Sequence, residues 1–415
     1  MNSVPSNSSR ILLLGGDIQS NMGDRAIRAA LISLIREAVP DAEFYAVSRQ
    51  PERDQREFGL RVLGSSAFAL LTRFRVLRRM TLVVWGGGQL LQDDTSLVKN
   101  LYWAAVLIWV RRIAGVPIVG LGIGIGPLTR RAGIILARLA LRNLTRCVGR
   151  DPETCSCIRR LTGGRVPVHQ AMDAALFLQP APTDFMDRPG GKSHMPDRTG
   201  NEVIIGVAVR RWFHLKKNPI LPYQWVAGWQ RESSTENERM EFFIRQIGAA
   251  LKRLGERHRL RLVFFPMAGM RWESDDVLSA KVADAAGWPT LILPLSDCDA
   301  ATVKTLAGSC DLFVTMRMHG AILAAGMGVP PITISHTPKS AYFHQSLDLQ
   351  DWVLDLNACA AEGGAEIMYE MFRNALAQRP TLTRHLRKRI AERRTDITIY
   401  RDTLLTTLSQ YGAHP

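Results

Sequence analysis

The sequence predicts an α/β protein in which two Rossmann-like domains face a common cleft. Short apolar runs alternate with longer segments of helical spacing, as expected for parallel strands joined by helices. The alternation stops in residues 179–201, which are rich in Pro, Gly and Asp, and then starts again. Glycines or cations follow the apolar runs, at the edge where open α/β sheets bind their ligands. Two such sheets joined by a linker place these edges on either side of a cleft.

The 415 residues are enough for two or three domains, each with its own core. We expect an N-terminal α/β domain over residues 1–178, a linker over 179–201 and a C-terminal α/β domain over 202–360. Residues 361–415 carry apolar positions near a helical repeat with arginines on the other faces, which predicts a basic helical segment. Such a segment can pack across both domains or lie near an anionic membrane, and packing is the preferred prediction.

Two glycine-bearing loops follow apolar runs in the N-terminal domain. Such loops present backbone N–H groups to phosphate or substrate oxygens. The first is not a dinucleotide-binding fingerprint, and a tight turn with Asp24 as helix cap is the alternative. The predicted substrate-binding residues of the two loops are Asn21, Gly23, Asp24, Gly87 and Gly88.

An arginine without a local structural role follows the apolar run at residues 146–149. Its neighbour Asp151 is explained as the N-cap of a helix that begins at Pro152. The local pattern gives no such explanation for Arg150. Arg150 therefore stands at the end of a predicted strand, the edge at which open α/β sheets bind their ligands.

Two neighbouring strand ends carry cations and imidazoles in the C-terminal domain. A strand, a helix and a second strand are predicted within residues 311–340. Arg317 and His319 follow the first strand, and His336 and Lys339 follow the second. A helix that begins near His319 adds its positive dipole end, so the cluster suits phosphate or carboxylate. The alternative is a structural arginine and a capping histidine on an ordinary helix.

Arg210 follows another predicted strand of this domain and is a further candidate for substrate binding, although an ordinary surface arginine is as good an explanation. Trp212, Trp225 and Trp229 lie in the connection after it. These rings either form a platform for sugar stacking or pack the connection onto the domain, and packing is the preferred prediction.

Lys and Arg outnumber Asp and Glu by 53 to 38, which gives a formal charge of +15 and favours anionic partners. Residues 61–79 are predicted to be helical and contain four clustered arginines. They form either a solvated basic face or a membrane-surface patch.

The apolar run after the polar first ten residues is too short for a secretory leader, so we expect a cytoplasmic protein. The most lipid-like segment, residues 101–110, stops after about ten residues, against the ~20 that a membrane-spanning helix needs. The six cysteines show no spacing typical of zinc sites or disulfide frameworks, and no metal site is expected.

Several of these motifs resemble those of the polysaccharide pyruvyl transferase family, from about Ile11 to Ser340. The matching stretches, in order, are Asn21-Met-Gly-Asp-Arg-Ala-Ile27, Gly86-Gly-Gly-Gln-Leu90, Arg150-Asp151, Arg317-Met-His-Gly320, and Gly328-Val-Pro-Pro-Ile-Thr-Ile334 with Thr337-Pro-Lys339. The sequence departs from the family pattern at Gly320, where a serine is common, and at His336, where an aromatic residue is frequent.

The resemblance implies a glycosyltransferase-B type fold and an enzyme that moves the enolpyruvyl group of phosphoenolpyruvate onto a saccharide as a pyruvate ketal. It implies donor-binding roles for Arg150 and Lys339, acid/base work for His319, and a supporting role for Arg317. Phosphoenolpyruvate is then a substrate, and no cofactor, metal or nucleic acid is required. The N-terminal domain is the expected acceptor side and the C-terminal domain the expected donor side.

This reading implies exopolysaccharide or cell-wall glycan biosynthesis. Together with the basic charge, it suggests work at the inner face of the membrane on a lipid-linked, anionic acceptor. Two alternatives stay open: a glycosyltransferase of the same fold, and a non-catalytic glycan- or lipid-binding protein. The first needs an acidic residue to hold a nucleotide ribose, for which the C-terminal domain offers no convincing candidate. The second has no use for a proton-transferring histidine.

Overall fold

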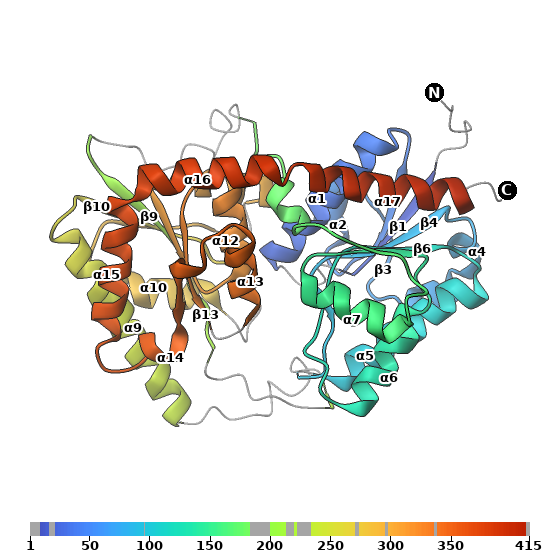
Figure 1. Cartoon of the computed structure of the whole chain (residues 1–415), viewed down its shortest axis with the longest axis horizontal. Helices are drawn as coiled ribbons and strands as arrows, with labels where there is room; N and C mark the ends of the chain where they lie inside the picture. Colours follow the sequence, from blue (N-terminus) through green and yellow to red (C-terminus); the bar gives the residue numbers. More distant parts are fainter. Residues whose placement is uncertain are drawn as a thin grey trace.

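The computed structural model describes residues 9–15, 21–94, 96–182, 200–212, 220–221, 234–269, 274–294, 298–335 and 338–411, with only the backbone for 338–340. Figure 1 shows two α/β lobes joined along one side by the C-terminal helices. Each lobe contains one parallel sheet with helices on both faces, so the predicted fold class is confirmed. No helix among the described residues is both long and apolar enough to cross a bilayer.

The sheet of the N-terminal domain has the strand order β3-β2-β1-β4-β6-β7-β8, with β5 paired to β6, and all its pairs are parallel. Its strands are β1 (Arg10–Leu14), β2 (Glu43–Val47), β3 (Arg61–Gly64), β4 (Leu82–Gly86), β5 (Gln89–Leu91), β6 (Ile118–Ile125), β7 (Arg146–Gly149) and β8 (Val168–Gln170). The prediction of helix at residues 61–64 was wrong, because this short edge strand has too few residues to show its own periodicity.

Alternation along the strands divides the apolar residues of this domain between two cores. Ile11 and Leu13 face one core, whereas Leu12 and Leu14 face the other. The second core is covered by α3 (Ala69–Thr72), α4 (Phe74–Leu77), α5 (Leu97–Ile108), the π-helical turn η1 (Trp109–Ile113), α6 (Arg131–Leu141) and α7 (Pro152–Thr162). The first is covered by α1 (Met22–Ala38), α2 (Pro51–Phe58) and the 3₁₀ turn η2 (Ala174–Phe177).

The sheet of the C-terminal domain has the order β11-β10-β9-β12-β13-β14, again all parallel. Its strands are β9 (Val203–Ala208), β10 (Leu260–Phe264), β11 (Thr290–Ile292), β12 (Leu312–Thr315), β13 (Pro331–Ser335) and β14 (Val353–Asp355). The helices between and after them are α9 (Ser234–Gly255), α10 (Asp275–Ala286), α11 (Ala300–Ala307), α12 (Met318–Gly326), α13 (Pro338–Ser346), α14 (Leu356–Cys359) and α15 (Gly364–Ala377). The βαβ unit expected within residues 311–340 is β12–α12–β13.

The chain ends in two helices that connect the lobes, α16 (Arg379–Glu392) and α17 (Thr395–Tyr411). Helix α16 lies along the C-terminal domain, and α17 returns to the N-terminal domain, where it packs against α1, β6, β7 and β8 (Figure 1). Tyr400 and Leu404 of α17 are buried in the core that α1 covers. The terminal segment therefore packs across both domains.

The N-terminus of α1 is a joint between the two domains. The Met22 N–H donates to the carbonyl of Met267 at 2.8 Å, and Asn21 forms an antiparallel bridge with Ala268. Helix α1 also packs against α11 and α12 of the C-terminal domain. As a result, one apolar core runs without interruption from the N-terminal sheet into the C-terminal one.

Candidate active site

Three polar side chains from three strand ends meet where the two domains face each other. Arg150 follows β7, Asp173 follows β8, and His319 lies in the first turn of α12, after β12. Arg150 Nη1 donates to Asp173 Oδ2 at 3.0 Å, and His319 Nε2 lies 3.5 Å from the same oxygen. The carboxylate of Asp173 therefore joins the two residues to which the sequence assigns chemistry in different domains.

The pKa of Asp173 reflects this position. Burial by itself raises it, but the hydrogen bond and charge of His319, the charge of Arg150 and the backbone N–H of Ala175 together outweigh burial. The net result is a pKa of about 2 for Asp173. The carboxyl group is thus ionised at neutral pH and can stabilise positive charge on either partner.

The three side chains differ in how far they are exposed to solvent. The side chains of Arg150 and Asp173 are 8% and 6% exposed, whereas that of His319 is 15% exposed. The imidazole is therefore the least buried of the three side chains, although its Nε2 atom, which faces Asp173, is itself buried. We call Arg150, Asp173 and His319 the cleft triad.

Gly23 of α1 lies directly against the His319 ring. A Cβ atom at this glycine would stand 2.3 Å from His319 Nδ1, so any side chain there would displace the imidazole. Because His319 is itself in the first turn of α12, the N-termini of α1 and α12 converge on it. Two positive dipole ends beside Arg150 make this point of the cleft favourable for an anion.

The alternating glycines after the central part of β6 have a steric role. A Cβ at Gly124 would lie 2.7 Å from Arg150 Nε, so the glycine provides the space in which the guanidinium rests. Gly122 has a φ of +63° and faces the hydroxyl of Tyr400. Strand β6 continues through these glycines to Ile125.

Arg317 forms a buried, two-pronged ion pair with Asp275. Its Nε and Nη2 atoms lie 3.0 and 2.6 Å from the two carboxylate oxygens. Asp275 also accepts the N–H groups of Met267 and Ala268, the segment that binds the N-terminus of α1. Arg317 therefore helps to position the domain joint, and its predicted contact with substrate stays a prediction.

The predicted loop residues of the N-terminal domain pack against one another at the start of α1. Asn21 caps the helix through a 3.0 Å bond from the Gly23 N–H. A Cβ at Gly88 would lie 2.6 Å from Asp24 Oδ1, and both Gly87 and Gly88 have positive φ, which glycine alone adopts readily. The glycine loop is therefore shaped around the Asp24 carboxylate.

Lys99 of α5 lies beside this loop, and sequence reasoning did not single it out. Its ammonium donates to the carbonyl of Gln89 at 2.8 Å. Burial lowers the pKa of Lys99, and the charges of Asp24 and Asp94 oppose that shift. A cation and a carboxylate thus stand close together in the N-terminal domain.

The remaining predicted residues are described to different extents. Arg210 follows β9, next to β12, and its guanidinium lies 5.3 Å from the centre of the Trp212 ring. Lys339 is in the first turn of α13, where the structure gives the backbone only. His336, Trp225 and Trp229 lie outside the described residues.

Helix α17 supports the cleft triad by holding the residue that precedes Asp173. Asp396 accepts the Met172 N–H at 2.7 Å, and the Tyr400 hydroxyl donates to the Met172 carbonyl at 2.8 Å. Both bonds fix the residue that precedes Asp173. Asp173 in turn caps η2 by accepting the Ala175 N–H at 3.0 Å. The carboxylate is therefore held by backbone contacts as well as by Arg150 and His319.

Sequence reasoning missed Asp173, Asp275 and Tyr400. The signal that could have found Asp173 is its place three residues after β8, the same edge position that singled out Arg150. Asp275 and Tyr400 act through partners far away in the sequence, which no local pattern shows.

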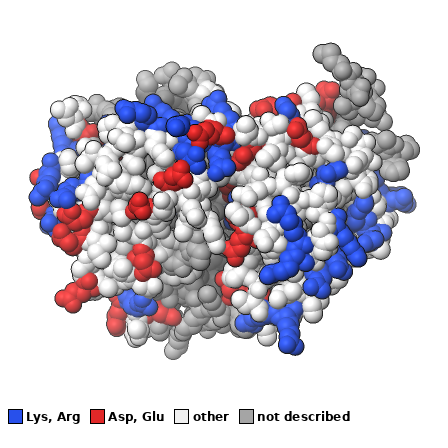
Figure 2. Space-filling view, in the orientation of Figure 1, with Lys and Arg blue, Asp and Glu red and all other residues white. Residues whose placement is uncertain are grey.

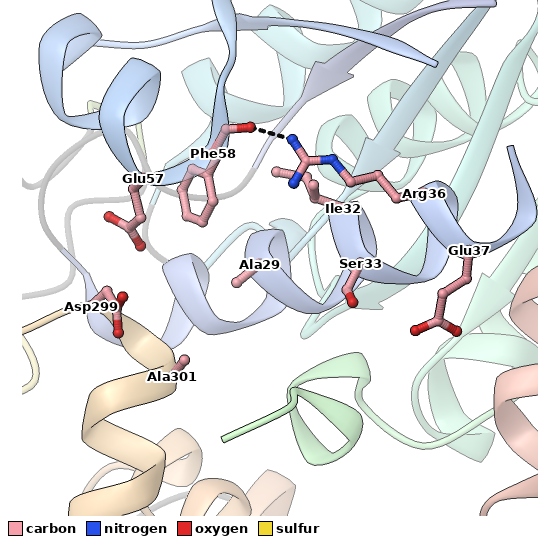
Figure 3. A pocket seen from close by; sticks show the side chains of 9 residues that line it. All are labelled: Ala29, Ile32, Ser33, Arg36, Glu37, Glu57, Phe58, Asp299 and Ala301. Atoms are coloured by element: carbon pink, nitrogen blue, oxygen red, sulfur yellow. Dashed lines mark hydrogen bonds between the residues drawn. The ribbon is translucent and has the colours of Figure 1, made fainter. Parts of the chain in front are cut away.

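A separate pocket of about 420 Å³ lies between α1, α2 and α11 (Figure 3). It faces the C-terminal half of α1, where Ala29, Ile32 and Ser33 line it, whereas the cleft triad contacts the first turn. The Arg36 side chain at its wall donates to the Phe58 carbonyl. None of the predicted site residues lines this pocket.

The described residues contain no group of three His, Cys, Asp or Glu side chains arranged to hold a metal ion. What they do bring together is an arginine, an imidazole, an ionised carboxylate and two helix N-termini. This arrangement can bind an anion and transfer a proton beside it.

Solved structures with the same architecture include several sugar-nucleotide enzymes. A UDP-N-acetylglucosamine 2-epimerase aligns with a TM-score of 0.61 and 11% identity over 98% of this chain and 97% of the other. The UDP-GlcNAc 2-epimerase of Neisseria meningitidis, solved with UDP-GlcNAc, gives 0.58 and 10% over 96% and 100%. HepE of Anabaena, solved with UDP-glucose, gives 0.57 and 11% over 97% and 99%.

Identities this low establish the fold alone, which is of the two-domain glycosyltransferase-B type. The family is given by the sequence: the profile of the polysaccharide pyruvyl transferases matches residues 21–338. That match covers more than half of the chain and contains all three members of the cleft triad. The chain therefore belongs to the polysaccharide pyruvyl transferase family.

Proposed function

We propose that this protein transfers the enolpyruvyl group of phosphoenolpyruvate to a saccharide and leaves a pyruvate ketal across two hydroxyls. The product belongs to exopolysaccharide or cell-wall glycan biosynthesis. The observation that carries the proposal is the cleft triad, in which an arginine and an imidazole share one ionised carboxylate inside the region that matches the family.

The donor carries a phosphate and a carboxylate, so its site needs positive charge from more than one direction. Arg150 offers a planar guanidinium, and the N-termini of α1 and α12 add their positive dipole ends. Lys339, at the start of α13, supplies a further point charge in this proposal. The donor then lies between the domains with its anionic groups against these cations.

The reaction forms two C–O bonds at the same carbon of the donor. One sugar hydroxyl oxygen adds to C2 of phosphoenolpyruvate while C3 takes up a proton and becomes a methyl group. The second hydroxyl oxygen replaces the phosphate at C2, and its proton leaves with that phosphate. No electrons are exchanged with an external oxidant or reductant.

His319 is the residue proposed to move these protons. A positioned imidazole that titrates near neutral pH accelerates proton transfer by about 10² to 10⁴. Asp173 stays ionised because its pKa is about 2, so it stabilises the imidazolium that forms when His319 accepts a proton. Arg150 shares that carboxylate, and it thereby links donor binding to the orientation of the imidazole.

The enzymatic alternative is a glycosyltransferase, since two of the structural neighbours were solved with UDP-sugars. The two proposed functions differ in the donor substrate that the protein should bind. We expect millimolar phosphoenolpyruvate to raise the unfolding temperature of the wild-type chain, whereas UDP and UDP-sugars should leave it unchanged.

The shift should be lost in Arg150→Ala and Lys339→Ala, each compared with its own ligand-free unfolding temperature. Arg165→Ala, an exposed position of the same domain, is the matched control and should respond as wild type does. Undiminished stabilisation in both site variants would remove them from the donor site. Stabilisation by UDP-sugars instead of phosphoenolpyruvate would favour the glycosyltransferase.

A further inference from the structure

The positive charge of the chain is concentrated in one stretch of the N-terminal domain. Residues 61–150 contain fourteen Lys or Arg against two Asp or Glu, a net charge of +12. The whole chain carries +15, so the rest of the sequence is nearly neutral. Of the two acidic residues, Asp93 is fully buried and accepts the N–H groups of Thr129 and Arg130. The surface of this stretch is therefore almost free of negative charge.

The helices of this stretch lie side by side on one face of the sheet. The Phe68 and Tyr102 rings meet at 5.4 Å, and Phe74 meets Trp109 at 5.5 Å, so the α3–α4 segment packs on α5 and η1. Helix α5 packs in turn on α6. All of them bury their inner sides in the same core, and Figure 1 shows α4, α5 and α6 on the outside of the lobe.

Large apolar side chains stand exposed on the outer sides of these helices. Phe68 is 60% exposed, Leu101 and Ile113 are each 55% exposed, and Ile135 is 56% exposed. With Leu71 and Leu139, they are six of the nine large hydrophobic residues that are exposed among those described. Scattered exposed apolar residues are ordinary, but this many on adjacent helices indicate a surface that is covered in use.

Arginines surround these apolar residues. We call the combined area the α3–α6 surface, and its exposed basic members are Arg73, Arg75, Arg78, Arg79, Arg112, Arg131, Arg138 and Arg142. Figure 2 shows Lys and Arg gathered over this lobe, with fewer acidic residues among them than on the other lobe. Arg138 on α6 and Arg142 directly after it stand close in sequence to Ile135 and Leu139, so charge and apolar area occur together.

This combination fits one class of partner. Arginines bind lipid phosphates, and exposed Leu, Ile and Phe side chains enter the boundary between headgroups and acyl chains. A nucleic acid would use the arginines but would leave the aliphatic side chains in water. We propose that the α3–α6 surface docks the N-terminal domain on an anionic lipid bilayer.

Docking by this surface has a consequence for the cleft. Helix α5 follows the end of β5 and α6 follows the end of β6, at the edge of the sheet from which Arg150 and Asp173 project. The surface therefore begins beside the mouth of the cleft. If the proposed pyruvyl transfer holds, this placement serves an acceptor saccharide that is carried on a lipid.

The test is flotation of the full chain with vesicles of phosphatidylcholine, with and without phosphatidylglycerol, at low and high salt. The wild type should bind only the anionic vesicles and should be released in part as salt screens the charges. The triple variant R131S/R138S/R142S should bind about 100-fold more weakly, since each charge near an anionic bilayer contributes about five-fold. The matched control is R384S/K388S/R394S on α16 and the turn after it, which removes three exposed cations elsewhere and should change little.

The contribution of the apolar side chains is tested separately, with the same vesicles. I135S/L139S should lose the binding that persists at high salt, whereas V277S/I367S on the other lobe should keep it. Equal binding to neutral vesicles, or a triple variant that binds as the wild type does, would overturn the proposal. If I135S/L139S binds normally while heparin competes fully with the vesicles, the surface is a general polyanion site and the proposal is wrong.

These measurements need no donor substrate. Failure of vesicle binding would therefore leave the proposed reaction untouched, and failure of the reaction would leave the vesicle result standing. Unfolding temperatures of all four variants close to that of the wild type will show that each substitution acts on the surface alone.

Discussion

Replacing Asp173 by asparagine removes the charge that joins the two domains at the site while it preserves shape and the cap on η2. Asn is as good a helix cap as Asp, so the bond from the Ala175 N–H is retained. What is lost is the ion pair with Arg150 at 3.0 Å and the contact with His319 at 3.5 Å. The variant therefore isolates the electrostatic part of the site.

The magnitude follows from the pKa. Asp173 has a pKa of about 2 in the folded chain, compared with an ordinary value of 3.8. Because a pKa unit corresponds to about 1.4 kcal/mol, the charge contributes about 2 kcal/mol of stability at pH 7. Removal of one partner from a buried ion pair also leaves the other charge uncompensated, which raises the expected loss to about 3 kcal/mol.

The sign of the pH dependence is fixed by the lowered pKa. As the pH falls below about 4, Asp173 becomes protonated in the unfolded chain while it is still ionised in the folded chain. The contribution of its charge to the free energy of unfolding therefore shrinks. It should fall from about 2 kcal/mol at pH 7 to about 1 kcal/mol at pH 3. The difference between wild type and Asp173→Asn in urea unfolding should narrow over the same range.

Asp355→Asn is the matched control, because Asp355 also caps a helix, by accepting the Ala358 N–H at 2.9 Å, but is exposed. The Asp355→Asn variant should lose little free energy of unfolding at any pH. A variant of Asp173 as stable as wild type at pH 7, or a loss that does not narrow on acidification, would refute the electrostatic account of the site.

Three further substitutions test the supports of the site. Tyr400→Phe deletes a buried hydrogen bond and should lower the free energy of unfolding by about 1 to 3 kcal/mol, measured in urea; an unchanged value would mean that α17 does not support the loop. Lys304 is buried, donates to the Leu176 carbonyl and has a pKa lowered by burial to about 7, so the unfolded chain binds its proton more tightly. Wild-type stability should therefore rise by about 2 kcal/mol more between pH 7 and 9 than that of Lys304→Met, and parallel curves would contradict this. Gly23→Ala places a methyl group against His319 and should lower turnover at least ten-fold at a cost of about 1 to 3 kcal/mol in stability; full turnover would show that the ring position is not critical.

The sequence allowed a good part of the fold to be predicted because the strands are buried on both faces and carry continuous apolar runs. The same reasoning selected Arg150 and His319 separately, from the ends of β7 and β12. It could not show that they share a carboxylate, because Asp173 is in a third segment and the contact depends on the packing of the two domains. The local sequence pattern identifies residues at the ends of strands, but it does not show which of them contact one another in the folded chain.

Elements with few residues or distant partners were the ones that sequence reasoning missed. The edge strand β3 has four residues, too few to separate it from the helices that follow. Arg317 was placed at the correct strand end, yet its role is set by Asp275, 42 residues earlier in the chain. Tyr400 bonds a carbonyl 228 residues away, so its contact exists only once α17 has returned to the N-terminal domain.

The central claim is that His319 moves protons in pyruvyl transfer from phosphoenolpyruvate. It is tested most directly by incubating wild type and His319→Gln with phosphoenolpyruvate and lipid-linked saccharides, and by measuring phosphate release together with the mass of the acceptor. We predict that the wild type releases phosphate and adds one pyruvyl ketal to the acceptor. His319→Gln should keep its unfolding temperature and its stabilisation by phosphoenolpyruvate while turnover falls by about 10² or more. Substantial turnover in a well-folded His319→Gln variant, or phosphate release without a ketal on the acceptor, would contradict the account.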